Sequence, residues 1–156
     1  MAFSNPFCNR TPKLLLLLFL LMSFSVQDVC GQSNQGTIIC KVTAFRNSSG
    51  RVELSLYNKE LNFPDLDMRW ITRQADLKNS SVVEVRFENV PFGTYAVAGL
   101  HDENKSGGMD YTWLGLPKEG YCFSNDAKPF LSPPSFSEAK FKLDKPQKVV
   151  YITMQY

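Results

Sequence analysis

The sequence predicts an all-β protein: an antiparallel immunoglobulin-like or transthyretin-like sandwich of about seven strands with one long ordered loop, with a closed barrel as the alternative. Three observations lead to this fold class. Apolar and polar residues alternate with a period of two in several segments. Clusters of Asn, Ser, Gly, Pro and Asp separate these segments, as turns do. No stretch keeps a helical period over three turns.

Seven segments are expected as strands, and in most of them the apolar residues fall on one face. In "TIICKVTAF", for example, Ile38, Cys40 and Val42 lie on one side of an extended chain, while Lys41 and Thr43 lie on the other. "GTYAVAGL" is apolar on both faces, as a central strand covered on both sides would be. The expected strands are 37–45, 51–58, 68–74, 81–88, 93–100, 138–143 and 148–156.

The connections carry turn signals, except for one long segment. "NSSG" at 47–50 is expected as a tight connection between the first two strands, and 58–67 has room for one helical turn that Pro64 would interrupt. Residues 103–136 show no periodicity, and connections this long in a compact domain are usually functional. Because the segment is rich in aromatic residues, which disordered linkers lack, we expect an ordered loop packed by its own rings.

The first 31 residues are expected to be a signal peptide. Arg10 and Lys13 precede the apolar run "LLLLLFLLMSF", which is shorter than the roughly 20 residues of a membrane-spanning helix. Small residues at 29–31 then suit cleavage before Gln32. A lipid on Cys30 is disfavoured by the charge of Asp28. We therefore expect export to the periplasm or the extracellular space, and a single β-sandwich domain over 32–156.

The charge balance argues against two classes of partner. The formal net charge is +2, with both signs interspersed, which gives no basic surface for nucleic acid. No basic amphipathic helix is present, so no membrane contact is expected after signal cleavage. Cys40 and Cys122 remain in the expected domain, and the sequence leaves open whether they form a disulfide or stay as two thiols.

The loop "DENKSGGMD" has the spacing of the first half of a calcium-binding loop. Oxygen-bearing residues stand at the first, third, fifth and ninth positions, namely Asp102, Asn104, Ser106 and Asp110. The twelfth position, which supplies a bidentate glutamate in the full motif, is Trp113, so any calcium site is expected to be weak. The alternative is a polar turn whose side chains bond backbone amides.

Catalytic signals are few. His101 is the single histidine, and a hydrolase using His101 with Asp102 or Glu119 is the least favoured hypothesis. A histidine that ends a strand and bonds its neighbours is the more ordinary interpretation. No motif for nucleophilic catalysis is present.

Aromatic residues of the long loop suggest binding. Tyr111, Trp113 and Tyr121 would stack on a glycan or contact a protein at the cell surface if they are exposed. The alternative is that these rings hold the loop on the sandwich.

The stretch "FENVPFGTYAVAGLHDENKSGGMDYTWLGLPKEGYCFSNDAKPFLSPPSFSEAKF" (87–141) resembles domain-of-unknown-function family 2141. The resemblance implies a small exported bacterial all-β domain with signature segments at His101–Asp110 and Gly115–Asn125, and it implies no activity. Ser106 departs from the family's usual Asn or Asp, and Cys122 from its usual Gly. The leading hypothesis is thus a non-enzymatic exported β-sandwich module, with calcium as the one cofactor considered; a carbohydrate- or peptide-binding module is the alternative.

Overall fold

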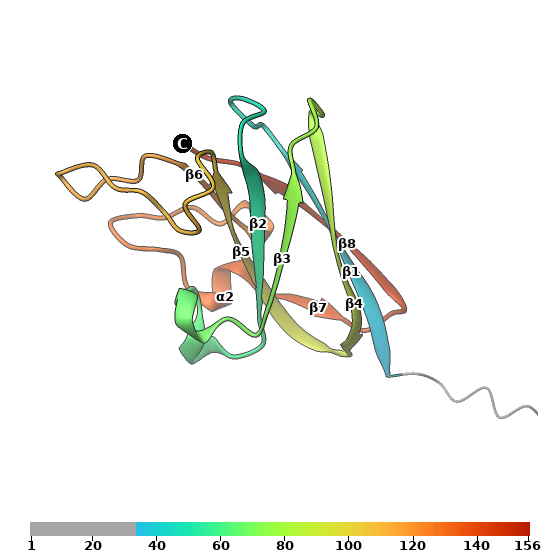
Figure 1. Ribbon diagram of the computed structural model, residues 1–156. Helices are drawn as coiled ribbons and strands as arrows, with labels where there is room; N and C mark the ends of the chain where they lie inside the picture. The colour runs from blue at the N-terminus through green and yellow to red at the C-terminus, as the bar shows by residue number, and fades with distance from the viewer. Residues whose placement is uncertain (1–33) are drawn as a thin grey trace, which may run out of the picture. The chain divides into compact units, whose positions relative to one another are not determined.

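The computed structural model describes residues 34–156, so the predicted signal peptide lies outside the described residues. The described part contains eight strands, three 3-10 turns and one short helix (Figure 1). The strands are β1 (Gln35–Thr43), β2 (Arg51–Tyr57), β3 (Ile71–Asp76), β4 (Val82–Pro91), β5 (Gly93–Asp102), β6 (Gly120–Phe123), β7 (Phe141–Leu143) and β8 (Gln147–Thr153). The helical elements are η1 (Glu60–Asn62), η2 (Leu66–Met68), η3 (Ser124–Asp126) and α2 (Phe136–Ala139). None of the helices in this range is long and apolar enough to cross a membrane.

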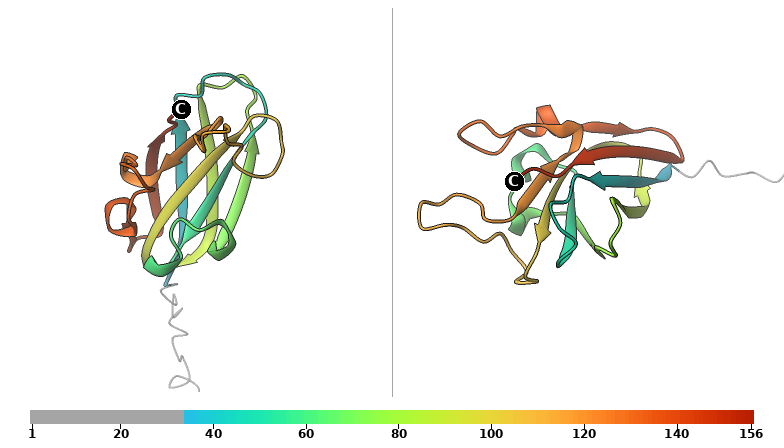
Figure 2. Two further views of the ribbon diagram at one scale, coloured as in Figure 1. Left: turned by 90° about the vertical axis from the view of Figure 1, so that its left-hand side faces the viewer. Right: turned by 90° about the horizontal axis from the view of Figure 1, so that it is seen from above.

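The strands form two sheets that face each other (Figure 2). The smaller sheet has the order β4-β1-β8, and the larger sheet has the order β3-β2-β5-β6, with β7 pairing with one end of β5. The all-β sandwich predicted from the sequence is confirmed. The structure adds an eighth strand, and it pairs β1 in parallel with β8 where the sequence suggested an antiparallel arrangement.

The core lies between the two sheets, because alternate residues of each strand point inward. In β1, Ile38, Cys40 and Val42 are fully buried, as their alternation predicts. A single cluster of buried side chains joins them to Leu54 of β2 and Val97 of β5, which belong to the other sheet. The hydrophobic contact between the sheets is therefore continuous from one layer to the other.

β5 is an interior strand of the larger sheet, paired along both edges, and most of its residues are buried, as its apolar sequence predicts. It pairs with the whole of β2 on one side, and with β6 and β7 on the other. Val97 points into the core. On the outer face, Ala98 and Leu100 lie beside the connections 58–70 and 103–119. These two connections create the candidate site described below.

Three details of the connections and strands differ from what the sequence predicted. The turn at 47–50 belongs to a connection that carries the chain from the smaller sheet to the larger, so it does not close a hairpin within one sheet. The strand expected at 68–74 begins only at Ile71, because the Asp65 side chain caps η2 and keeps the preceding residues in a 3-10 turn. Where the sequence suggested one helical turn within 58–67, residues 60–68 hold two 3-10 turns, one on each side of Pro64.

The long segment 103–136 is ordered, as predicted, but it consists of several elements. A hairpin closed by the bridge between Tyr111 and Pro117 comes first, and β6 and η3 follow. The chain then returns through residues 127–135 to α2, where Ser135 and Glu138 form a reciprocal capping box. This short helix occupies the start of the strand expected at 138–143, which is reduced to β7.

Candidate functional site

The outer face of the larger sheet carries two rows of side chains, fixed by the strand register. The first row crosses β3, β2, β5 and β6 as Thr72, Ser55, Ala98 and Phe123. The second row crosses them as Gln74, Glu53, Leu100 and Tyr121. Because the middle of the first row is small and the residues along β6 are aromatic, the sheet surface is hollowed beside β6.

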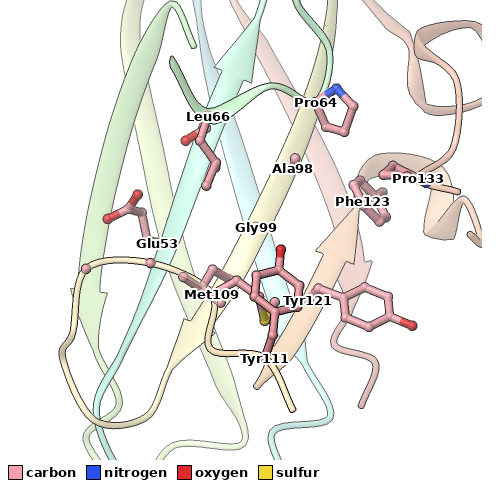
Figure 3. A pocket seen from close by; sticks show the side chains of 14 residues that line it. Glu53, Pro64, Leu66, Ala98, Gly99, Met109, Tyr111, Tyr121, Phe123 and Pro133 are labelled. Atoms are coloured by element: carbon pink, nitrogen blue, oxygen red, sulfur yellow. The ribbon is translucent and has the colours of Figure 1, made fainter. Parts of the chain in front are cut away.

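This hollow, the outer-face groove, is a cavity of about 160 Å³. Its floor is formed by Ser55, Ala98 and the glycine that follows Ala98. Met109 and Tyr111 of the hairpin stand on one side, and Pro64 and Leu66 stand on the opposite side (Figure 3). The groove therefore depends on both long connections as well as on the sheet.

The wall at Pro64 is held from below by Tyr57. The Tyr57 hydroxyl donates a hydrogen bond to the Pro64 carbonyl oxygen at 3.2 Å. Burial is the main cause that raises the pKa of Tyr57 to about 12, so this phenol stays protonated and keeps donating at any physiological pH. The turn that forms this wall is thereby fixed to β2.

Glu53 is the one charged residue that lines the groove among the described residues. Its carboxylate accepts hydrogen bonds from Arg69, at 2.7 Å, and from Gln74. The neighbouring Ser55 hydroxyl shares a hydrogen bond of 3.0 Å with the Thr72 hydroxyl. Since a carboxylate has about four acceptor positions, Glu53 is held in one orientation and still has acceptor capacity for a ligand.

Two buried carboxylates hold the hairpin that forms the groove wall. Asp102 accepts hydrogen bonds from the backbone amides of Ser106 and Gly107 at 2.9 and 3.0 Å, and its Oδ2 lies 3.1 Å from an Arg51 guanidinium nitrogen. Glu119 accepts from the backbone amides of Glu103 and Asp110 at 3.0 and 3.2 Å. These contacts satisfy backbone donors along the hairpin, as in the polar turn that the sequence left as the alternative to calcium.

The four residues predicted to bind calcium lie close together, but they bond mainly to protein donors. Asp102 and Asn104 each accept from the Ser106 amide through Oδ1, and the Asn104 side-chain amide donates to Asp110 at 2.7 Å. The Ser106 hydroxyl donates to a backbone carbonyl. Within residues 34–156 no group of three or more His, Cys, Asp or Glu side chains is arranged to hold a metal ion. Calcium binding here stays a prediction.

His101 is enclosed and makes two hydrogen bonds through its ring. Its side chain has 0% exposure. Nε2 lies 2.8 Å from the Ser49 carbonyl oxygen, to which it must donate; in the neutral ring, Nδ1 then accepts from the Tyr156 hydroxyl at 2.7 Å. Asp102 is equally buried. The hydrolase hypothesis gains no support from this arrangement, because neither ring nitrogen is available to a substrate.

Asn125 has a structural position between η3 and α2. Its backbone is left-handed, with φ of 60°, which asparagine tolerates better than most residues. Its side-chain amide donates to the carbonyl oxygens of Glu138 and Lys140 at 3.1 and 2.9 Å. These bonds tie β6 and η3 to the chain that enters β7.

The three predicted ligand-binding aromatics separate into two places. Tyr111 and Tyr121 both line the groove. Trp113 lies at the tip of the hairpin with 92% of its side chain exposed, and it does not line the groove. The sequence analysis did not predict three other residues that line the groove, namely Glu53, Ser55 and Ala98. Their outward direction follows from the alternation in β2 and β5, but their grouping depends on the pairing of these strands.

Both cysteines of the described residues are free thiols buried in the core. Burial raises the pKa of Cys40 to about 12 and also raises the pKa of Cys122. The sequence left open whether Cys40 and Cys122 form a disulfide or stay as two thiols, and in the structure they are two thiols.

Comparison with known proteins places the chain in a family. The model of a family described as "Uncharacterized protein conserved in bacteria (DUF2141)" matches residues 40–151. No curated protein and no solved structure matches the chain. The matched range runs from β1 into β8 and contains the residues that line the groove. The chain therefore belongs to the DUF2141 family, as the resemblance of its central segments predicts.

Proposed function

We propose that the protein is an exported, non-enzymatic binding module whose outer-face groove takes one sugar ring of a glycan. The observation that carries the proposal is the groove itself, about 160 Å³ in volume, with a small-residue floor and aromatic rings in its lining. A cavity of about 150 Å³ accommodates a benzene-sized ring, so the volume suits one six-membered ring. Tyr111 and Tyr121 supply flat faces on which the apolar side of a sugar ring packs.

The polar groups of the groove favour a sugar over an apolar side chain of a peptide. Glu53 is fixed by Arg69 and Gln74, and it accepts hydrogen bonds from hydroxyl groups without first reorganising. The Tyr111 and Tyr121 hydroxyls both donate and accept. Few, fixed polar groups within a mainly apolar lining are typical of small-molecule sites. Export rests on the predicted signal peptide at 1–31 and is part of the proposal.

A glycan array followed by calorimetry with the best ligand tests this function. We expect Tyr121→Ala and Tyr111→Ala each to weaken binding by about tenfold, because an aromatic contact contributes about 0.5–1.5 kcal/mol and 1.4 kcal/mol corresponds to tenfold. Ala98→Leu should abolish binding, since it fills the groove. Tyr151→Ala is the control, because Tyr151 is exposed on β8 of the other sheet.

Two results would overturn the proposal. One is an array with no bound glycan. The other is binding that both tyrosine variants retain at wild-type strength. If a proline-rich or aromatic peptide binds the protein and this binding is lost in Tyr121→Ala, the groove is a peptide-binding site and not a sugar-binding site.

Calcium in the 102–110 loop is the second candidate. It is favoured by the convergence of Asp102 Oδ1 and Asn104 Oδ1 on the same amide, each at 2.9 Å. The ion would have to displace this amide and compete with the Arg51 guanidinium at Asp102, so we expect weak affinity. Thermal unfolding in millimolar calcium and in chelator is the measurement. Equal midpoints would end the calcium prediction, because an ion that binds the folded state raises its stability.

A further inference from the structure

Two loop tips of the described chain expose large apolar side chains to solvent. The hairpin tip carries Trp113, Leu114 and Leu116, of which Trp113 is 92% exposed. The connection 127–135 carries Phe130 and Leu131, which are 85% and 98% exposed. Single exposed apolar residues are common on protein surfaces, but such a concentration at two loop tips marks an interaction site.

The backbone holds the first tip in its exposed form. The Thr112 amide donates to the Leu116 carbonyl at 2.8 Å, and the Gly115 amide donates back to the Thr112 carbonyl at 2.9 Å. The Thr112 hydroxyl also accepts from the Leu116 amide at 3.1 Å. Gly115 has a φ of +77°, which permits the tight reversal. The turn is thus closed by its own hydrogen bonds, and the apolar side chains are presented outward.

Both tips project from the same side of the molecule. In Figure 1 the hairpin and the 127–135 connection extend to the left of the sheets, and in the view from above in Figure 2 they again extend to the same side. Lys118 stands at the base of the first tip and Lys128 just before the second, and both are exposed. Of the nearby carboxylates, Glu103 pairs with Arg46, Glu119 is buried against backbone amides, and the exposed Asp126 accepts from the Thr153 amide and hydroxyl.

We propose that these two tips dock the protein on the surface of a phospholipid bilayer with anionic headgroups. Trp113, Leu114, Phe130 and Leu131 would enter the boundary between headgroups and acyl chains, where Trp is favoured, and Lys118 and Lys128 would meet the headgroup phosphates. The exposed Lys118 and Lys128 beside the apolar tips favour a bilayer with anionic headgroups as the occupant, because basic groups at the surface are attracted to anionic lipid. The sequence excluded membrane contact because it lacks a basic amphipathic helix; here a hairpin and a loop present the apolar groups instead.

The two tryptophans of the chain, Trp70 and Trp113, allow a direct test. In a Trp70→Phe variant, Trp113 is the single tryptophan, so selective excitation of tryptophan reports on the hairpin tip, and the apolar run at 14–24 contributes no tryptophan signal. With vesicles of phosphatidylcholine and phosphatidylglycerol we expect a blue shift of its emission, and quenching by brominated acyl chains. Vesicles of phosphatidylcholine alone, or high salt, should reduce both effects. Emission that no vesicle composition changes would overturn the proposal.

Variants then identify which side chains bind the bilayer. In the Trp70→Phe background, Leu114→Ser with Leu131→Ser, and separately Lys118→Glu with Lys128→Glu, should each lose most of the blue shift. Tyr151→Ser is the matched control, an exposed aromatic residue 68% accessible on β8. Circular dichroism checks that each variant is folded. Tip variants that bind vesicles like the control would overturn the proposal, whereas loss of sugar binding in Tyr121→Ala leaves it unaffected.

Discussion

Gly99 illustrates how a single residue determines the packing of the larger sheet. It lies on β5 between β2 and β6, opposite Leu54 and Cys122. A Cβ built at this position would contact the Leu54 side chain and would lie 2.6 Å from the Cys122 Sγ. Both neighbours are fully buried, so neither has free space into which to move. Glycine is therefore needed here for its size.

We expect Gly99→Ala to lower the free energy of unfolding by about 1–3 kcal/mol, the usual range for overpacking a core. Gly108→Ala is the control, because no atom lies within 4 Å of its added Cβ. Urea denaturation of both variants measures the difference. Equal stability of the two would contradict the packing described for β5.

The raised pKa values of the buried thiols lead to a second prediction at this scale. Because burial favours the neutral form, and Cys40 has a pKa of about 12, the reactive thiolate is scarce in the folded protein at pH 8. We expect Cys40 and Cys122 to resist alkylation at pH 8 until denaturant is added. Peptide mapping by mass spectrometry distinguishes them from Cys8 and Cys30. Rapid native labelling of Cys122 would contradict its burial.

At the scale of elements, the sequence analysis succeeded where a strand is long and either alternates apolar with polar residues or is apolar throughout. The sequences of β1, β2 and β4 alternate apolar with polar residues, and that of β5 is a long apolar run, so the positions of these strands were predicted closely. β6 was missed because it has four residues and its outward Tyr121 and Phe123 are as apolar as its inward Cys122. The parallel pairing of β1 with β8 joins strands from opposite ends of the described chain, and the local sequence pattern of a strand does not show which distant strand it pairs with. The candidate site was predicted only in part for the same reason, because local pattern does not show which strands pair. Tyr111 and Tyr121 were predicted, whereas Ser55 and Ala98 are neighbours only through the register of β2 and β5.

The hairpin 103–119 depends on Glu119, which has no role in any exposed contact. Glu119→Ala would leave the amides of Glu103 and Asp110 without their acceptor, at about 1–3 kcal/mol for each buried donor. We expect faster proteolytic cleavage within 103–119 and weaker ligand binding in the groove. Asp144→Ala, at an exposed ion pair, is the control. Unchanged cleavage would show that the hairpin is held by other contacts.

At the scale of the whole molecule, residues 154–156 join the two sheets at one corner. The Met154 amide donates to the Thr43 carbonyl in the smaller sheet at 3.0 Å. Gln155 then exchanges two backbone hydrogen bonds with Tyr121 of β6 in the larger sheet, at 2.8 and 2.9 Å. Tyr156 follows, with its hydroxyl on His101 and its ring under the Arg46 guanidinium, 4.5 Å from the ring centre.

We therefore expect Tyr156→Phe to destabilise the whole fold by about 1–3 kcal/mol, because it removes the donor to a fully buried histidine while keeping the ring. Tyr151→Phe, which removes an exposed hydroxyl, should leave the unfolding midpoint unchanged. Thermal denaturation followed by circular dichroism compares the two. A midpoint for Tyr156→Phe equal to that of the wild type would show that His101 finds another donor.

The bridge between Tyr111 and Pro117 places a wall residue of the groove at the base of the turn that carries Trp113. With that turn embedded, the groove would lie near the lipid headgroups, within reach of saccharides rooted in the same leaflet. Encounter with such a glycolipid would then be a search in two dimensions, and a modest intrinsic affinity for the sugar would suffice to retain it.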